Sequence, residues 1–178
     1  MNPFRATTAG RDVFDDLFRE HVDAVWRTAV AMGVAPDAAH DVVQEVFMTA
    51  HRRFEDFDDR RAVRPWLLGI TRNVVRHHHR GASRRDAHLR QVPSPPPPEL
   101  PSREVERREA ADLLQRFLDQ LDDKKRIVFV LGHVEGLTVK EIAATLGLKP
   151  ATVYARAQAA REALTRFVAR QQRKETSA

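Results

Sequence analysis

The 178-residue sequence has no cysteine, one tyrosine, two tryptophans and three methionines. Without cysteine, disulfide frameworks and thiolate metal sites are excluded. No apolar run approaches the roughly 20 residues that a membrane-spanning helix needs, and residues 1–12 lack the apolar core of a signal peptide. We therefore expect a cytoplasmic protein, and its 42% of apolar residues is enough to form hydrophobic cores.

Sustained alternation of apolar and polar residues, the mark of a half-buried strand, is also missing. Apolar residues recur instead every three or four positions, which predicts amphipathic helices. We predict an all-α fold of two small helical domains, a three-helix bundle followed by a four-helix domain. The predicted helices cover about 12–32, 36–54, 64–80, 102–120, 122–134, 138–146 and 150–168.

A proline-rich stretch, "QVPSPPPPELPS", separates the two domains, since six of the ten prolines fall within residues 93–101. Proline fixes φ and lacks an N–H donor, so this stretch forms neither a helix nor a central strand. We predict an extended linker that lets the domains contact separate targets. The predicted organisation is an N-terminal tail (1–11), a first domain (12–81), the linker (82–102), a second domain (103–172) and a C-terminal tail (173–178).

The charge is unevenly distributed around a net value of +5. Residues 36–59 carry seven acids and two arginines, residues 60–90 carry nine arginines and one acid, and residues 149–174 carry seven bases and one acid. Two basic segments favour contact with nucleic acid at two places. The acidic helix is either a solvated surface or a docking face for a protein, because acidic helices do not approach DNA well.

The stretch "GLTVKEIAATLGLKPATVYARAQAAREAL" predicts a helix-turn-helix. Thr138 and Glu141 form a T-x-x-E capping box that begins a short helix, Gly147 ends it, and Pro150 begins a longer basic helix. In this arrangement the second helix enters the major groove of DNA. The alternative is a surface helix in an ordinary αα-hairpin.

The predicted helix 64–80 presents arginines four residues apart, which suits contacts with phosphates. Trp66 can stack on an exposed base, although the start of an amphipathic stripe is more often core. The triplet His77–His79 is not a metal site, because consecutive helical side chains diverge by about 100°. We predict no metal, no cofactor and no catalytic activity, since no nucleophile–base pair or phosphate loop is present.

Two strings, "D-x-x-Q-E-x-F" in residues 41–47 and "R-P-W-L-x-x-I-x-R-N" in residues 64–73, are specific in combination. Together with the helix-turn-helix, they make the chain resemble bacterial sigma factors of the extracytoplasmic-function type. Residues 12–81 resemble region 2 of that family and residues 103–168 resemble region 4. The resemblance implies a non-enzymatic subunit that directs core RNA polymerase to promoters.

The resemblance also implies sites and partners. One partner is core RNA polymerase, through the clamp helices of its largest subunit and the flap of the second largest. Promoter DNA is another, and family members often bind an anti-sigma factor. The implied polymerase-binding residues are Asp41, Gln44 and Glu45. The implied −10 DNA-binding residues are Arg61, Arg64, Arg72, Asn73, Arg76, His77 and Arg80. The implied −35 residues are Lys149, Thr152, Tyr154, Ala155, Arg156, Gln158 and Arg161.

The recognition helix departs from the family's usual pattern. Tyr154 replaces a base, Ala155 a serine and Ala159 an arginine, and Lys149 stands where a better N-cap is common. We expect a −35 sequence outside the family consensus, or weaker binding there. The competing hypothesis is a stand-alone helix-turn-helix regulator, which would not need the acidic Asp41 and Glu45 face.

Overall fold

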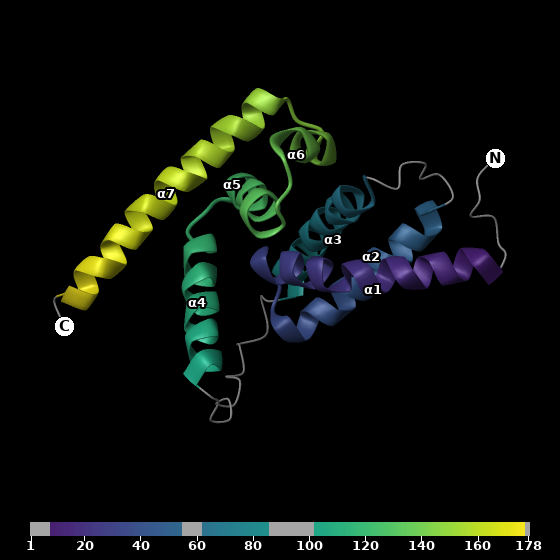
Figure 1. Cartoon of the computed structure of the whole chain (residues 1–178), viewed down its shortest axis with the longest axis horizontal. Coiled ribbons are helices and arrows are strands. Elements are labelled where there is room, and N and C mark those ends of the chain that lie inside the picture. The colour runs from purple at the N-terminus through teal and green to yellow at the C-terminus, as the bar shows by residue number, and fades with distance from the viewer. Residues whose placement is uncertain (1–7, 55–61, 86–101, 177–178) are drawn as a thin grey trace.

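The computed structural model describes residues 8–54, 62–85 and 102–176, and no strand occurs among them. The all-α prediction is confirmed (Figure 1). The helices are α1 (Thr8–Ala31), α2 (Pro36–Arg53), α3 (Val63–Arg85), α4 (Ser102–Leu118), α5 (Asp123–Phe129), the π-helical turn η3 (Val130–Val134), α6 (Val139–Leu146) and α7 (Pro150–Thr176).

Helices α1, α2 and α3 pack against one another as the first helical unit. Gly33 follows α1 with φ of 90°, a conformation that glycine adopts without strain, and Pro36 starts α2. Apolar residues at three- and four-residue spacing predict a buried stripe along α2, and this prediction is confirmed in full. Its buried members are Ala39, Val42, Val43, Val46, Phe47, Ala50 and, just beyond the helix, Phe54.

The second unit comprises α4 to α7. Asp122 caps α5, and its side chain accepts a hydrogen bond of 3.0 Å from the Lys125 backbone N–H. The last turn of α4 packs with α5 and α7 around Phe117, Phe129 and Phe167 in a small hydrophobic cluster. This cluster fixes the long α7 helix on α5.

The two units share a hydrophobic core. One continuous cluster of buried residues joins α1, α2 and α3 to Ile127, Val128, Leu131 and Ile142 of the second unit. Figure 1 shows α5 and α6 beside the first bundle, while α4 and α7 project away from it. The structure therefore describes a closed arrangement, in which the segments on either side of the predicted linker lie in contact.

Helix α3 meets α6 at Gly69. A Cβ atom at Gly69 would lie 3.2 Å from Cγ2 of Thr145, so the glycine permits the close approach. A glycine inside a helix predicts a close helix contact, because it otherwise costs stability relative to alanine. This prediction is confirmed for Gly69, and its partner is a helix of the second unit. Helix α3 also continues to Arg85, four residues into the predicted linker. The rest of that linker up to residue 101 lies outside the described residues.

Several side chains differ from the predicted burial. The helical spacing of Phe18, Leu113 and Leu114 predicts that they point inward, yet their exposed fractions are 40%, 37% and 38%. The two leucines are exposed because α4 projects beyond the cluster that holds its last turn. Conversely, Leu68 and Val75 of α3 are fully buried although the sequence did not single them out. Among the helices of the described ranges, none is long and apolar enough to cross a membrane.

Candidate nucleic-acid interface

The predicted helix-turn-helix is present as α6 and α7. Glu141 accepts a hydrogen bond of 2.7 Å from the Thr138 backbone N–H, and Thr138 Oγ1 accepts one of 3.3 Å from the Glu141 N–H. This capping box fixes the start of α6. Gly147 then adopts a left-handed conformation with φ of 63°, and α7 begins at Pro150. The local sequence therefore sets the angle between the two helices.

The start of α7 presents most of the predicted −35 residues to solvent. Val153 is fully buried and anchors this end of the helix. Tyr154 is 65% exposed, Thr152 and Arg156 are half-buried, and Gln158 bonds to Glu162 at 3.2 Å. Lys149, Ala155 and Arg161 are also exposed. Amide, guanidinium and methyl groups on one helix end are the groups that read base edges in a major groove.

Four of the predicted −10 residues of α3 lie on its solvent side, namely Asn73, Arg76, His77 and Arg80. Arg72 is half-buried, and burial together with the nearby Arg76 and Arg156 lowers its pKa below the ordinary value. The basic stripe that the sequence predicts on α3 therefore exists, and one of its members lies close to the recognition helix of the second unit.

Two further −10 residues are placed differently. The Arg64 guanidinium bonds to the carboxylate of Glu135 at 2.6 Å, so in this arrangement it is engaged within the protein. Arg61 lies outside the described residues. Trp66 is half-buried against the core cluster and also lines a cleft of about 330 Å³ between α3 and α6, which Asn73, Ala144 and Thr145 border. The expectation that Trp66 belongs to the core is thus met in part, while stacking on a base stays a prediction.

The histidine triplet spreads around α3. His79 donates from Nε2 to the carbonyl oxygen of Met32 at 3.0 Å, and His77 is exposed. Among the described residues, no group of three or more His, Cys, Asp or Glu side chains is placed to hold a metal ion.

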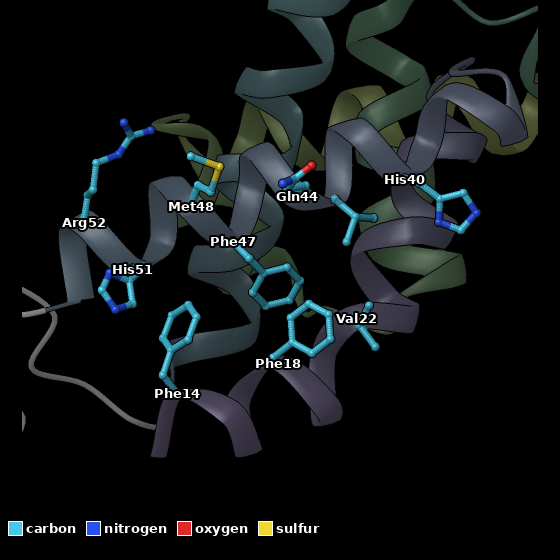
Figure 2. Close-up of a pocket in the computed structure, with 10 residues that line it drawn as sticks. Phe14, Phe18, Val22, His40, Gln44, Phe47, Met48, His51 and Arg52 are labelled. Atoms are coloured by element: carbon cyan, nitrogen blue, oxygen red, sulfur yellow. The ribbon is translucent and has the colours of Figure 1, made fainter. Parts of the chain in front are cut away.

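The outer face of α2 exposes Asp41, Gln44 and Glu45. Beside it runs an apolar groove of about 640 Å³ between α1 and α2 (Figure 2). Phe18 and Met48 border the groove, while Phe47 lies at its base with its ring centroid 4.6 Å from that of Phe18. Gln44 belongs to both the polar face and the groove. Sequence reasoning missed this groove, because Phe18 has the spacing of a core residue.

Glu135 is the other residue that sequence reasoning missed. Its side chain is fully buried and bonds to Arg27 at 3.3 Å and to Arg64 at 2.6 Å. The only local signal is an acid directly after the apolar stretch 127–134. Nothing in the sequence points to arginines 108 and 71 residues away.

Comparisons with known proteins agree with this geometry. The family model for sigma-70 region 2 matches residues 17–85, and the model for sigma-70 region 4 matches residues 111–164. NccH, an RNA polymerase sigma factor of Alcaligenes xylosoxydans, is 31% identical over 172 residues, which cover 90% of this chain and 89% of NccH. The chain belongs to the sigma-70 family of RNA polymerase sigma factors.

The relatives of this sigma factor include members of the extracytoplasmic-function group. The ECF sigma factor SigE of Mycolicibacterium smegmatis is 34% identical over 162 residues, which cover 88% of this chain and 62% of SigE. CnrH, solved in complex with the cytosolic domain of CnrY, superimposes with a TM-score of 0.67 at 28% identity over 89% of this chain and 88% of CnrH. RpoE of Bartonella quintana, solved with NepR, shares the fold with a TM-score of 0.70 at 22% identity over 87% of this chain and 96% of RpoE.

Proposed function

We propose that this sigma factor binds core RNA polymerase through the outer face of α2 and directs it to promoters through α3 and α7. The main support for this proposal is that one chain presents three exposed faces of distinct chemistry on separate helices. One face is acidic and two are basic. A stand-alone regulator would not need an acidic face beside an apolar groove, and the family relationship favours a sigma factor.

The charge of each face determines which target it suits. Asp41 and Glu45 repel DNA and suit a basic surface of the polymerase, where complementary charge speeds encounter and fixes register. Arg72, Asn73 and Arg76 of α3 suit the −10 element, where phosphates and opened bases are accessible. The start of α7 suits the major groove of the −35 element. The factor acts by binding and positioning, without chemistry of its own.

A regulatory partner is part of the proposal. CnrH is held by the cytosolic domain of CnrY and the Bartonella RpoE by NepR. We propose that an anti-sigma protein also binds this chain and withholds it from polymerase.

Exchanging two charges on α2 tests the polymerase face. Asp41→Lys combined with Glu45→Lys should weaken binding to core polymerase of the same bacterium at least about a hundredfold, because two attractive contacts become repulsive. The matched control is Glu20→Lys with Asp23→Lys, an equal charge change at exposed positions of α1. Fluorescence titration against core polymerase measures both.

The same proteins test promoter direction. Wild-type protein added to core polymerase should give start-site-specific transcripts from genomic DNA, and the Asp41/Glu45 variant should give none. Tight binding of the free protein to a palindromic operator, with core polymerase left inactive on every promoter, would establish the stand-alone regulator instead.

A further inference from the structure

The shared core of the two units contains an ionic cluster, formed by Arg27 of α1, Arg64 of α3 and Glu135 after η3. The Glu135 side chain has no solvent exposure, whereas the arginine side chains are 47% and 42% exposed. We propose that this Glu135 cluster is a latch, which holds the free sigma factor in a closed form that cannot receive promoter DNA. The second half of that statement rests on the proposed function.

Both partners of the Glu135 carboxylate come from the other unit. Glu135 Oε2 accepts from Nη2 of Arg27 and from Nη2 of Arg64, and Oε1 has no hydrogen-bond partner within the described ranges. A buried carboxylate is costly unless it is paired. If the units separate, water can solvate Glu135 and both arginines. The loss of an arginine therefore penalises the closed form rather than the fold of either unit.

Closure places α6 against the beginning of α3, at one end of the candidate −10 face, while Arg76, His77 and Arg80 stay exposed. The Thr145 hydroxyl donates to the carbonyl oxygen of Pro65 at 3.4 Å, and Thr145 packs on Gly69. The cleft that remains is bordered by Trp66 and Asn73 on one side and by α6 on the other. A DNA strand that runs along α3 from the exposed Arg76 to Trp66 must displace α6, so contacts along the whole face require an open form.

Closure also brings the two basic faces together. Burial, the neighbouring Arg76 and then Arg156 of the second unit lower the pKa of Arg72, so in the closed form Arg156 lies near enough to Arg72 for the two positive charges to interact. Two faces that contact separate promoter elements need to move apart, and the closed form keeps Arg72 and Arg156 close to each other. Their mutual repulsion opposes closure, and the Glu135 cluster offsets it. A partner that binds the open and closed forms with modestly different affinity can therefore shift the equilibrium between them.

Cysteine cross-linking can measure the closed population, because the chain has no cysteine of its own. Gly69→Cys with Thr145→Cys places one thiol on each unit. A Cβ at Gly69 would lie 3.2 Å from Cγ2 of Thr145, so the two positions are adjacent, as a disulfide with roughly 3.5–4.5 Å between its Cβ atoms requires. The rate of disulfide formation then reports how often the free protein is closed.

The expected result is at least about a tenfold slower cross-link when Glu135→Gln is added to this pair, since the latch has lost its charge. Asp123→Asn removes an exposed acid from the same unit and should leave the rate unchanged. Arg27→Gln removes one arginine partner of Glu135 from the first unit and should also slow the cross-link. This variant tests the proposal even if Glu135→Gln fails to fold. Equal rates in all folded backgrounds would overturn the latch.

The inhibitory consequence is tested with core polymerase. The oxidised, cross-linked form of the Gly69→Cys/Thr145→Cys protein should lower start-site-specific transcription at least about tenfold, and reduction should restore it. Proteins with either substitution alone should ignore the oxidant. Full transcription by the cross-linked protein would overturn the inhibitory role. If the reduced protein directs no initiation with its own polymerase, the proposed function fails, while the cross-linking rates still decide the latch.

Discussion

The two helices proposed to contact promoter DNA differ in what surrounds them. Helix α3 contacts α1, α2 and α6, so its solvent-facing stripe is narrow and Arg72 is half-buried. The start of α7 contacts the protein through Val153 and leaves Tyr154 and Ala155 exposed. Under the proposed function, the start of α7 is therefore open to a duplex, whereas part of the α3 face is covered by α6. The proposal thus assigns this protein one DNA-binding face that is available and one that closure controls.

Matched leucine truncations give the largest expected difference between the two helices. Leu68→Ala, in the fully buried part of α3, should lower the free energy of unfolding by about 3 kcal/mol. Leu164→Ala, on the half-buried side of α7, should cost about 1 kcal/mol because less apolar surface is lost. Chemical denaturation followed by circular dichroism measures both. Equal costs would mean that α3 is no more enclosed than α7.

Arginine removal on α7 should act on DNA recognition alone. Arg156→Ala should lower initiation at promoters that depend on the −35 element about tenfold, since a specific base contact contributes roughly 1–3 kcal/mol. Arg166→Ala, an exposed arginine further along the same helix, serves as the control. The comparison is made on templates with an intact and with a mutated −35 element. An Arg156→Ala deficit of the same size on both templates would contradict a role in reading it.

Removing the Thr138 cap of α6 should have the next largest effect, on the stability of the fold. Thr138→Val removes the side chain that accepts from Glu141 and should cost about 1 kcal/mol of stability, seen as a lower Tm. A Thr138→Ser variant keeps the acceptor and should behave like the wild type. An unchanged Tm for Thr138→Val would show that packing alone holds the start of α6.

The pH dependence of that cap should be smaller still. Hydrogen bonds from the Thr138 hydroxyl and N–H hold the pKa of Glu141 below its ordinary value of 4.5. A carboxylate with a lowered folded pKa stabilises the fold above the unfolded pKa, and this contribution is lost as the pH falls through the folded pKa. The stability difference between wild type and Glu141→Gln should therefore be constant above about pH 5 and shrink below it. A difference that grows on acidification would contradict this assignment.

The contrast between the helices also explains what the sequence could predict. The ends of α6, the start of α7 and the buried stripe of α2 follow from caps, glycines and spacing, and all were correctly predicted. These features depend on residues within one or two turns. The burial of Leu68 and Val75 depends on what packs over α3 in the folded chain, and periodicity within α3 does not contain that information.

The proposed functional faces also separate into features set by nearby residues and features set by distant ones. The outward residues of the recognition helix were predictable, because a helix-turn-helix fixes which side of its second helix is free. The family resemblance implied that Arg64 contacts DNA, yet a carboxylate 71 residues later engages it in the closed form. The groove beside Gln44 was missed for a related reason, since Phe14, Phe18 and Val22 have the spacing of buried residues and only the position of α2 leaves them partly open.

The π-helical turn η3 has a consequence for tolerated changes in chain length. The Glu135 N–H bonds to the Val130 carbonyl oxygen at 3.0 Å, five residues back, so the turn holds one residue more than an α-helical turn would. Deleting one residue there would restore ordinary helical pairing and rotate everything after it by about 100°. The carboxylate would then leave its arginines, and α6 would present another side to Gly69. An insertion or deletion in this segment therefore changes the direction in which the following helices run. The number of residues in this one turn is a feature by which homologues can be compared.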